Sequence, residues 1–259
     1  MNNYSKGPHL RPPCSGWQED LTHPDIAPTV EASLGAENPN HICETYLEVS
    51  RPPHLARGLV LYLTISVSAM LILLGLFFIP DSETDAVYNF AGIALDFVVV
   101  WLVAFGIRVD TAPPRDMPLR FNRARRRIYA YNFQFRWWNP LGRWHVVPVS
   151  YDWPQVRAER WMKRAFTAQG SLIIKWGVVL SIVEPGTNNV IDRFPLSTMG
   201  ADEFTWAYIC TYMQQGPSAL PPPGPPRDHN DVPWYNIALR LAPAVKWPTA
   251  MDLESRTAS

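Results

Sequence analysis

Two long apolar stretches constrain this chain more than any other feature. Residues 58–79 form a run of 22 without a charged side chain, and residues 86–107 form a second run of 22 whose only charge is Asp96. At about 1.5 Å of rise per residue, a helix of either length spans the hydrocarbon core of a bilayer, which is about 30 Å thick. Only residues 80–85 connect the runs, so we expect an antiparallel transmembrane hairpin; a buried core hairpin of a soluble protein is the alternative.

The charges beside these stretches predict their orientation. Arg51 and Arg57 precede the first stretch, seven arginines lie between residues 108 and 127, and the connection carries Asp81, Glu83 and Asp85 but no Lys or Arg. The positive-inside rule therefore predicts a membrane protein with two spans and both termini in the cytoplasm. A cleaved signal peptide is not expected, because 57 mostly polar residues come before the first stretch.

The remaining chain predicts an α+β protein with four parts. Residues 1–57 are an irregular, proline-containing arm with one added strand over 42–49; residues 58–107 are the hairpin; residues 108–216 are a cytoplasmic antiparallel β-rich domain closed by a helix over 202–215; residues 217–259 are a proline-rich linker and tail. The strand-rich domain with a closing helix is the pattern of a pleckstrin-homology-like barrel. Its strands are expected at 119–121, 127–133, 144–149, 156–161, 171–183 and 190–194.

The sequence offers no positive sign of catalysis. It contains no nucleophile elbow, phosphate loop or metalloprotease signature, and its six histidines are scattered. Cys14, Cys43 and Cys210 are all cytoplasmic in the expected topology, where disulfides are rare. We therefore expect a protein that is not an enzyme and that holds no cofactor and no metal.

The net charge of zero conceals a strongly uneven distribution. Residues 1–50 hold two basic and seven acidic side chains, whereas residues 115–164 hold twelve basic and three acidic ones. A basic segment directly after a membrane span attracts anionic lipid headgroups. We expect lipid contact here; an acidic protein partner and nucleic acid are weaker alternatives, and the final prediction is no nucleic acid. The candidate lipid-binding residues are Arg120, Arg123, Arg125, Arg126 and Arg127.

Asp96 is the most costly residue of the apolar stretches. A carboxylate at mid-span costs about 2.5–3.5 kcal/mol on insertion scales, so such a residue is a functional candidate. It could stay protonated or face Thr64, Ser66 or Ser68 of the other helix. We expect it to hold the hairpin or a homo-oligomer together; proton or ion transport is the alternative.

Two segments resemble a known family. The sequence PLRFNRARRRIY at residues 118–129, directly after the hairpin and followed by VSYDWPQV at 149–156, is similar to a family of uncharacterised proteobacterial membrane proteins. Members of that family are found beside type VI secretion effectors and look like immunity proteins. The resemblance covers roughly residues 50–220 and supplies no catalytic residue.

The resemblance implies a location in the bacterial inner membrane and a function in bacterial competition. The protein would bind a cognate type VI secretion toxin that acts in the cytoplasm, plausibly a nuclease, and would neutralise it by occluding its active site. Because a nuclease groove is cationic, acidic side chains are the expected contacts. The candidates are Glu31, Glu37, Glu44, Glu48, Asp202 and Glu203. A membrane-tethered lipid-binding or scaffolding module is the alternative, and an ion or proton channel component is the third reading.

Overall fold

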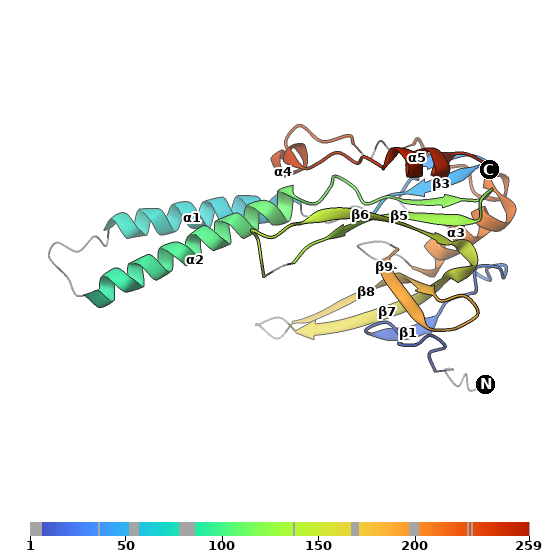
Figure 1. Ribbon diagram of the computed structural model, residues 1–259, viewed down its shortest axis with the longest axis horizontal. Coiled ribbons are helices and arrows are strands. Elements are labelled where there is room, and N and C mark those ends of the chain that lie inside the picture. Colours follow the sequence, from blue (N-terminus) through green and yellow to red (C-terminus); the bar gives the residue numbers. More distant parts are fainter. Residues whose placement is uncertain are drawn as a thin grey trace.

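Two antiparallel sheets pack face to face, and a pair of apolar helices projects from one end of them (Figure 1). The computed structural model describes residues 7–35, 37–51, 57–77, 86–136, 138–166, 171–196, 202–226, 228 and 230–258. Mixed α+β architecture with antiparallel sheets, as expected from the sequence, is confirmed. We call the end of the sheets from which the helices project the helix-proximal end, and the opposite end the distal end.

The first sheet has the strand order β2-β3-β4-β5-β6. Its strands are β2 (His41–Ile42), β3 (Tyr46–Val49), β4 (Leu119–Asn122), β5 (Arg127–Gln134) and β6 (His145–Asp152). Strand β3 precedes both apolar helices and β4 follows them, yet the two pair directly, with Leu47 opposite Phe121. The helices are therefore an insertion between adjacent strands of one sheet, and residues 41–49 belong to the domain rather than to a separate arm.

The second sheet has the strand order β1-β7-β8-β9. Its strands are β1 (Trp17–Asp20), β7 (Val156–Phe166), β8 (Leu172–Val183) and β9 (Val190–Pro195). Strand β1 lies in the segment that was expected to be irregular, so the sequence prediction was incomplete there. Its pairing with β7 is long-range, with Asp20 opposite Glu159, and its residues WQED carry no alternating apolar pattern that could reveal a strand.

The hydrophobic core lies between the two sheets and is closed at the distal end by α3 (Glu203–Gln215) (Figure 1). Asp202 caps this helix by accepting a hydrogen bond of 3.1 Å from the backbone N–H of Thr205. Gly216 follows with φ of 92°, a left-handed conformation that favours glycine. Trp206 stacks against Trp153, with 5.6 Å between ring centroids, and joins the helix to the segment that connects the sheets.

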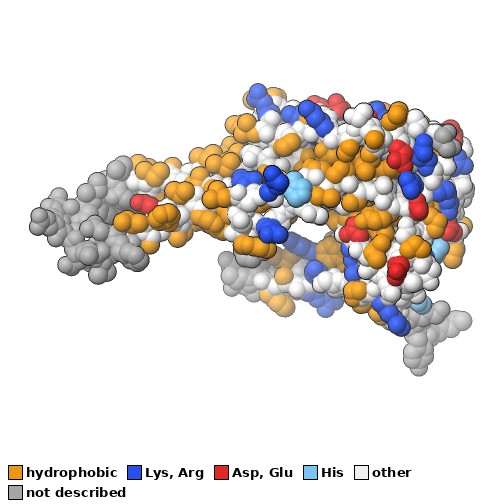
Figure 2. All heavy atoms as spheres, viewed as in Figure 1, with side chains coloured by type: hydrophobic (Ala, Val, Ile, Leu, Met, Phe, Trp, Pro, Cys, Tyr) orange, Lys and Arg blue, Asp and Glu red, His pale blue; other side chains and the backbone are white. Residues whose placement is uncertain are grey.

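The apolar helices are α1 (Leu59–Phe77) and α2 (Ala86–Thr111). By length and composition, one described segment, Gly92–Thr111, could cross a membrane; the apolar segment Leu59–Leu73 is shorter. Figure 2 shows hydrophobic side chains along the visible surface of both helices. The acidic connection with Asp81, Glu83 and Asp85 lies outside the described residues.

The C-terminal part is integrated into the domain, which differs from the expected linker and tail. Residues 221–226 run exposed and without regular structure, but α4 (Ile237–Leu241) and α5 (Thr249–Arg256) follow. Helix α5 lies over the first sheet near the distal end, and α4 lies beside the base of the apolar helices (Figure 1). Sequence patterns missed α5 because it is short and mostly polar, TAMDLESR, so that its position depends on contacts with distant residues.

Candidate functional site

The arginines at residues 120–127, which were expected to bind lipid, form ion pairs and hydrogen bonds that connect different elements at the distal end of the domain. Arg120 is only 1% exposed and forms an ion pair with the buried Glu48. Its guanidinium also donates hydrogen bonds to Asp252, at 2.6 Å, and to Ser255, at 2.8 Å. A side chain buried in this way does not reach a lipid headgroup. Glu48, one of the acidic toxin-contact candidates, is equally inaccessible to a partner for the same reason.

The other four arginines of the cluster have protein partners as well. Arg123 lies 3.5 Å from Glu44, and Arg126 pairs with Asp25 at 2.5 Å. Arg125 donates to the carbonyl of Thr257 at 3.1 Å. Arg127 lies between two carboxylates, Asp152 and Glu254, each at 2.8 Å.

This arrangement explains why a cluster of positively charged side chains is stable. The arginines lie in the β4–β5 turn and in the strands beside it, and acidic residues of the N-terminal segment and of α5 surround them. The hydrogen bond from Arg127 holds the pKa of Glu254 below its ordinary value. Figure 1 places this turn at the distal end, away from α1 and α2. The charge of the arginines at residues 120–127 is therefore balanced locally by carboxylates, most of them from distant parts of the chain.

Four acidic candidates come together on a different surface. The backbone N–H of Ser33 donates to the carbonyl of Phe204 at 3.3 Å, so that the segment 31–37 lies beside the start of α3. Glu31 and Glu37 are exposed there, while Asp202 and Glu203 are half-buried. We call these four residues the acidic arm–α3 surface. Glu44, on the β2–β3 turn, is exposed and contacts Arg123 instead.

A small pocket adjoins the acidic arm–α3 surface. Its volume is about 120 Å³, and it lies between the arm and the proline-rich segment. Asn38 and Gly224 meet so closely that a Cβ at Gly224 would lie 2.3 Å from the Asn38 side-chain oxygen. The lining residues are Ser33, Leu34, Gly35, Glu37, Asn38, Pro39, Tyr208, Pro221, Pro222, Pro223 and Gly224. The proline-rich segment is thus packed against the arm, and it frames this surface rather than acting as a free linker.

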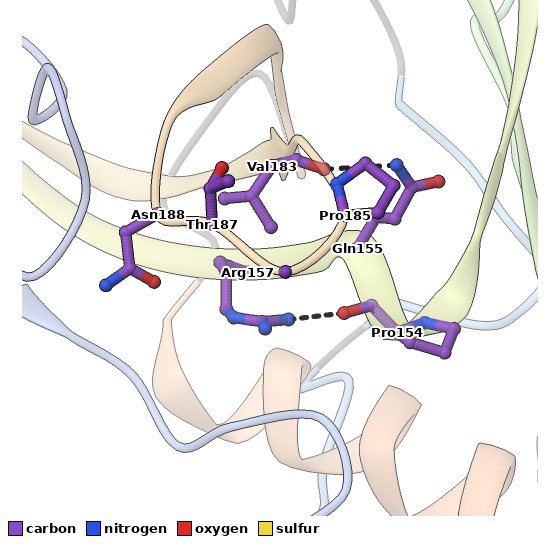
Figure 3. Close-up of a pocket in the computed structure, with 8 residues that line it drawn as sticks. Pro154, Gln155, Arg157, Val183, Pro185, Thr187 and Asn188 are labelled. Atoms are coloured by element: carbon purple, nitrogen blue, oxygen red, sulfur yellow. Dashed lines mark hydrogen bonds between the residues drawn. The ribbon is translucent and has the colours of Figure 1, made fainter.

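A second pocket, of about 570 Å³, opens beside the β8–β9 turn (Figure 3). Arg157 is the one charged residue among its lining residues, and it donates to the carbonyl of Pro154 at 2.7 Å. Gln155 donates to the carbonyl of Val183 at 3.1 Å and closes another side. The lining offers neither a carboxylate pair nor a nucleophile beside a base, so it has no groups for acid–base or covalent catalysis.

Buried charge also secures the N-terminal segment to the second sheet, which sequence patterns did not reveal. Glu159 is fully buried and accepts hydrogen bonds from the backbone N–H of Cys14, at 2.9 Å, and from Arg193, at 3.1 Å. Ser181 donates to the same carboxylate. Burial, with a further contribution from Glu159, raises the pKa of the Cys14 thiol to about 12. This cysteine therefore stays a thiol at neutral pH and is not a reactive nucleophile.

Asp96 does not meet the polar side chains expected to face it. Its side chain is exposed on α2, whereas Thr64 of α1 lies against Gly106 of α2. Gly106 is ten residues from Asp96, which corresponds to about 15 Å along a helix. The antiparallel packing of the two helices thus puts Thr64, Ser66 and Ser68 near the helix-proximal end and Asp96 nearer the far end of the hairpin.

Among the described residues, no group of three or more His, Cys, Asp or Glu side chains is arranged to hold a metal ion.

Comparison with known proteins identifies a family for this chain. No curated protein and no solved structure matches the sequence. The model of a protein family of unknown function, DUF6708, matches residues 96–259, from the middle of α2 to the C-terminus. This match covers more than half of the chain, and the protein therefore belongs to the family of unknown function DUF6708.

Proposed function

We propose that this protein is a membrane-anchored immunity protein that binds a cognate type VI secretion toxin in the cytoplasm. It would act by occluding the toxin's active site, without catalysis of its own. The observation that carries this proposal is the acidic arm–α3 surface, where a backbone hydrogen bond brings the segment with Glu31 and Glu37 beside the start of α3, which carries Asp202 and Glu203. Such a surface complements a cationic active-site groove, as in a nuclease.

The proposed anchor is a two-span hairpin with both termini in the cytoplasm. Helix α2 is supported by the length and apolar character of Gly92–Thr111, and α1 by the largely exposed apolar side chains of Leu59–Leu73. The base of the hairpin is tightly joined to the domain, because Arg57 donates to the carbonyls of Asp110, Pro113 and Pro114. Reporter fusions at each terminus and in the 80–85 connection test this topology; a periplasmic reporter signal from either terminus would overturn it.

We further propose that the fold is a pleckstrin-homology-like barrel that has acquired the hairpin as an insertion. The support is its topology: strands β3 to β6 form a meander in one sheet, β7 to β9 form a meander in the other, and α3 follows directly. Residues 7–42 and α5 would be additions to the strands and helix of the barrel.

The immunity proposal is tested by co-expression with the effector encoded beside the gene. The full-length protein is expected to restore survival and to co-purify with the toxin. Charge removal by Glu31→Gln, Glu37→Gln and Asp202→Asn together is expected to weaken protection; Asn is chosen at residue 202 because it also caps helices well. Glu184→Gln, an exposed carboxylate in the β8–β9 turn, is the matched control. Unchanged survival with and without the wild-type protein would end the immunity proposal.

A further inference from the structure

Three segments that are distant in sequence end together at the helix-proximal end of the domain. Figure 1 shows the β5–β6 turn, the paired ends of β7 and β8, and α4 at the end from which α1 and α2 project. The β5–β6 turn is fixed to α2, because Arg108 donates to the carbonyls of Pro140 and Gly142. The segment before α4 is fixed to α1, because the Tyr62 hydroxyl donates to the carbonyl of Tyr235 at 3.5 Å. These contacts hold the segments beside the bases of the apolar helices.

The same three segments expose large apolar side chains. Leu141 in the β5–β6 turn is 81% exposed, Phe166 at the end of β7 is 75% exposed, and Trp234 before α4 is 83% exposed. Every residue of β8 from Leu172 to Trp176 is exposed, although the strand is paired along its length. In water, such a surface favours aggregation.

One face of the β7–β8 end is an uncovered continuation of the core. In an antiparallel pair, opposite residues share a face, as do alternate residues along each strand. The buried Ala158 and Leu180 are opposite each other, and the same face continues outward along both strands. Its outer members are Met162, Arg164, Phe166, Leu172, Ile174 and Trp176. The strand pair therefore projects beyond the packed part of the sandwich with an apolar surface that no described residue buries.

The charge of the β5–β6 turn and of the paired ends of β7 and β8 has one sign. Residues 133–151 and 160–183 contain no Asp or Glu. They carry five exposed cations: Arg136, Arg143, Lys163, Arg164 and Lys175. Figure 2 shows Lys and Arg side chains at the helix-proximal end of the visible face. The arginines of the β4–β5 turn, in contrast, lie at the distal end beside carboxylates, so the two basic regions differ in both place and environment.

The geometry points to a second, interfacial membrane contact. The β5–β6 turn, the ends of β7 and β8 at Phe166 and Leu172, and α4 insert into the headgroup region of an anionic bilayer. Trp and Tyr combined with Lys and Arg are the residues that anchor proteins at this depth. A bilayer, rather than a protein partner, fits because the three segments lie at the end from which the apolar helices project, and two of them are hydrogen-bonded to the bases of those helices. This inference rests on the anchor part of the proposed function and is independent of the toxin.

The domain would consequently have a fixed orientation on the membrane. The helix-proximal end would be held against lipid, and the acidic arm–α3 surface at the distal end would face the cytoplasm (Figure 1). The cations that contact phosphate groups would be those of the β5–β6 turn and of the paired ends of β7 and β8, in place of the arginines at residues 120–127.

The experiment places a fluorophore at single cysteines in the full-length protein, reconstituted in vesicles that contain brominated acyl chains. Cys43→Ser serves as the background, because Cys14 and Cys210 are buried. The labelled positions are Leu141→Cys and Leu172→Cys at the inferred contact, Asn188→Cys at the distal β8–β9 turn, and Phe97→Cys on the exposed surface of α2. Vesicles of phosphatidylethanolamine with phosphatidylglycerol are compared with pure phosphatidylcholine.

We expect bromine quenching on the order of twofold at residues 141 and 172, as for side chains inserted at the interface, and none at residue 188. Quenching at 172 is expected to be stronger with phosphatidylglycerol, and Lys163→Gln, Arg164→Gln and Lys175→Gln together are expected to remove that difference. Quenching at 97 but not at 141 and 172 would overturn the interfacial contact alone. Absence of quenching at 97 would overturn the anchor and, with it, this inference.

Discussion

The carboxylate of Asp110, in the last turn of α2, accepts a hydrogen bond of 2.7 Å from the backbone N–H of Leu61, in the first turn of α1. It also accepts one of 3.1 Å from Gly58. The end of one apolar helix thereby caps the start of the other. Helix N-termini carry unsatisfied N–H groups and favour a nearby negative charge, so a single side chain both closes the hairpin base and stabilises α1.

Replacement of Asp110 is therefore expected to loosen the hairpin base. Asp110→Ala removes the acceptor of two buried N–H groups, and loss of a helix cap costs about 0.5–2 kcal/mol. Thermal unfolding of the full-length protein in detergent measures the effect. Asp110→Asn keeps an acceptor oxygen, so its loss of stability should be smaller. Equal loss in both variants would show that the charge, not the cap, is what matters.

The ion pair between Glu48 and Arg120 predicts a strong, non-additive effect on stability. Removal of one partner of a buried pair typically costs about 3–5 kcal/mol, because the other charge stays buried. Arg120→Met should cost more than Glu48→Gln, since Arg120 also holds Asp252 and Ser255. The double variant should lose less free energy of unfolding than the sum of the single variants, by about 0.5–3 kcal/mol.

Denaturant unfolding of the full chain measures this cycle. Asp152→Asn is the matched control, because the Asp152–Arg127 pair lies in the same cluster but is exposed on both sides. An exposed pair contributes only about 0–1 kcal/mol. Strictly additive effects for Glu48 and Arg120 would contradict the direct coupling of the two side chains.

The lowered pKa of Glu254 predicts that the docking of α5 onto the domain is weakened by acid. Hydrogen bonds from Arg127 and Tyr129 lower its pKa below the ordinary value of 4.5. A carboxyl group whose pKa is lower in the folded state stabilises that state above the unfolded pKa, and the contribution disappears as the pH falls through the folded pKa. The stability difference between the wild type and Glu254→Gln should thus be constant above about pH 5 and should shrink below pH 4.5.

The measurement is the denaturant midpoint of both proteins across this range. Because other carboxylates titrate in the same window, only the difference between the two proteins reports on Glu254. A difference that stays constant down to the most acidic conditions would contradict the role given to its ion pair with Arg127.

Local patterns in the sequence predicted the elements whose signals are local. The apolar runs at 58–79 and 86–107 correspond to α1 and α2, and the alternation at 127–133 corresponds to β5. Strand β1 and helix α5 escaped prediction because both are short and polar. What makes them stable is contact with distant residues: the ion pair of Glu19 with Arg160 for β1, and that of Asp252 with Arg120 for α5.

Prediction of the candidate site was limited for the same reason, because its environment depends on contacts between residues that are distant in sequence. A count of charges located the basic residues 120–127, but it could not tell that carboxylates at residues 25, 48 and 254 would neutralise them. The exposed cations of the β5–β6 turn and of the paired ends of β7 and β8 lay in the same basic segment or just beyond it. Their separate position follows only from strand register, which fixes which residues lie at each end of a sheet.

The packing of α1 against α2 can be tested at two glycines of the same helix. A Cβ at Gly106 would lie 2.0 Å from the hydroxyl oxygen of Thr64 and 2.8 Å from its Cβ, so rotation of the Thr64 side chain cannot relieve the clash. A Cβ at Gly92 would meet nothing within 4 Å. Alanine is favoured over glycine in a helix interior by about 1 kcal/mol. Gly92→Ala should therefore be neutral or stabilising, whereas Gly106→Ala should force the helices apart and lower the melting temperature in detergent. Thr64→Gly combined with Gly106→Ala moves the small residue to the other helix and should recover part of the loss. If the two alanine variants behave alike, the close approach at Gly106 is not what holds the hairpin together.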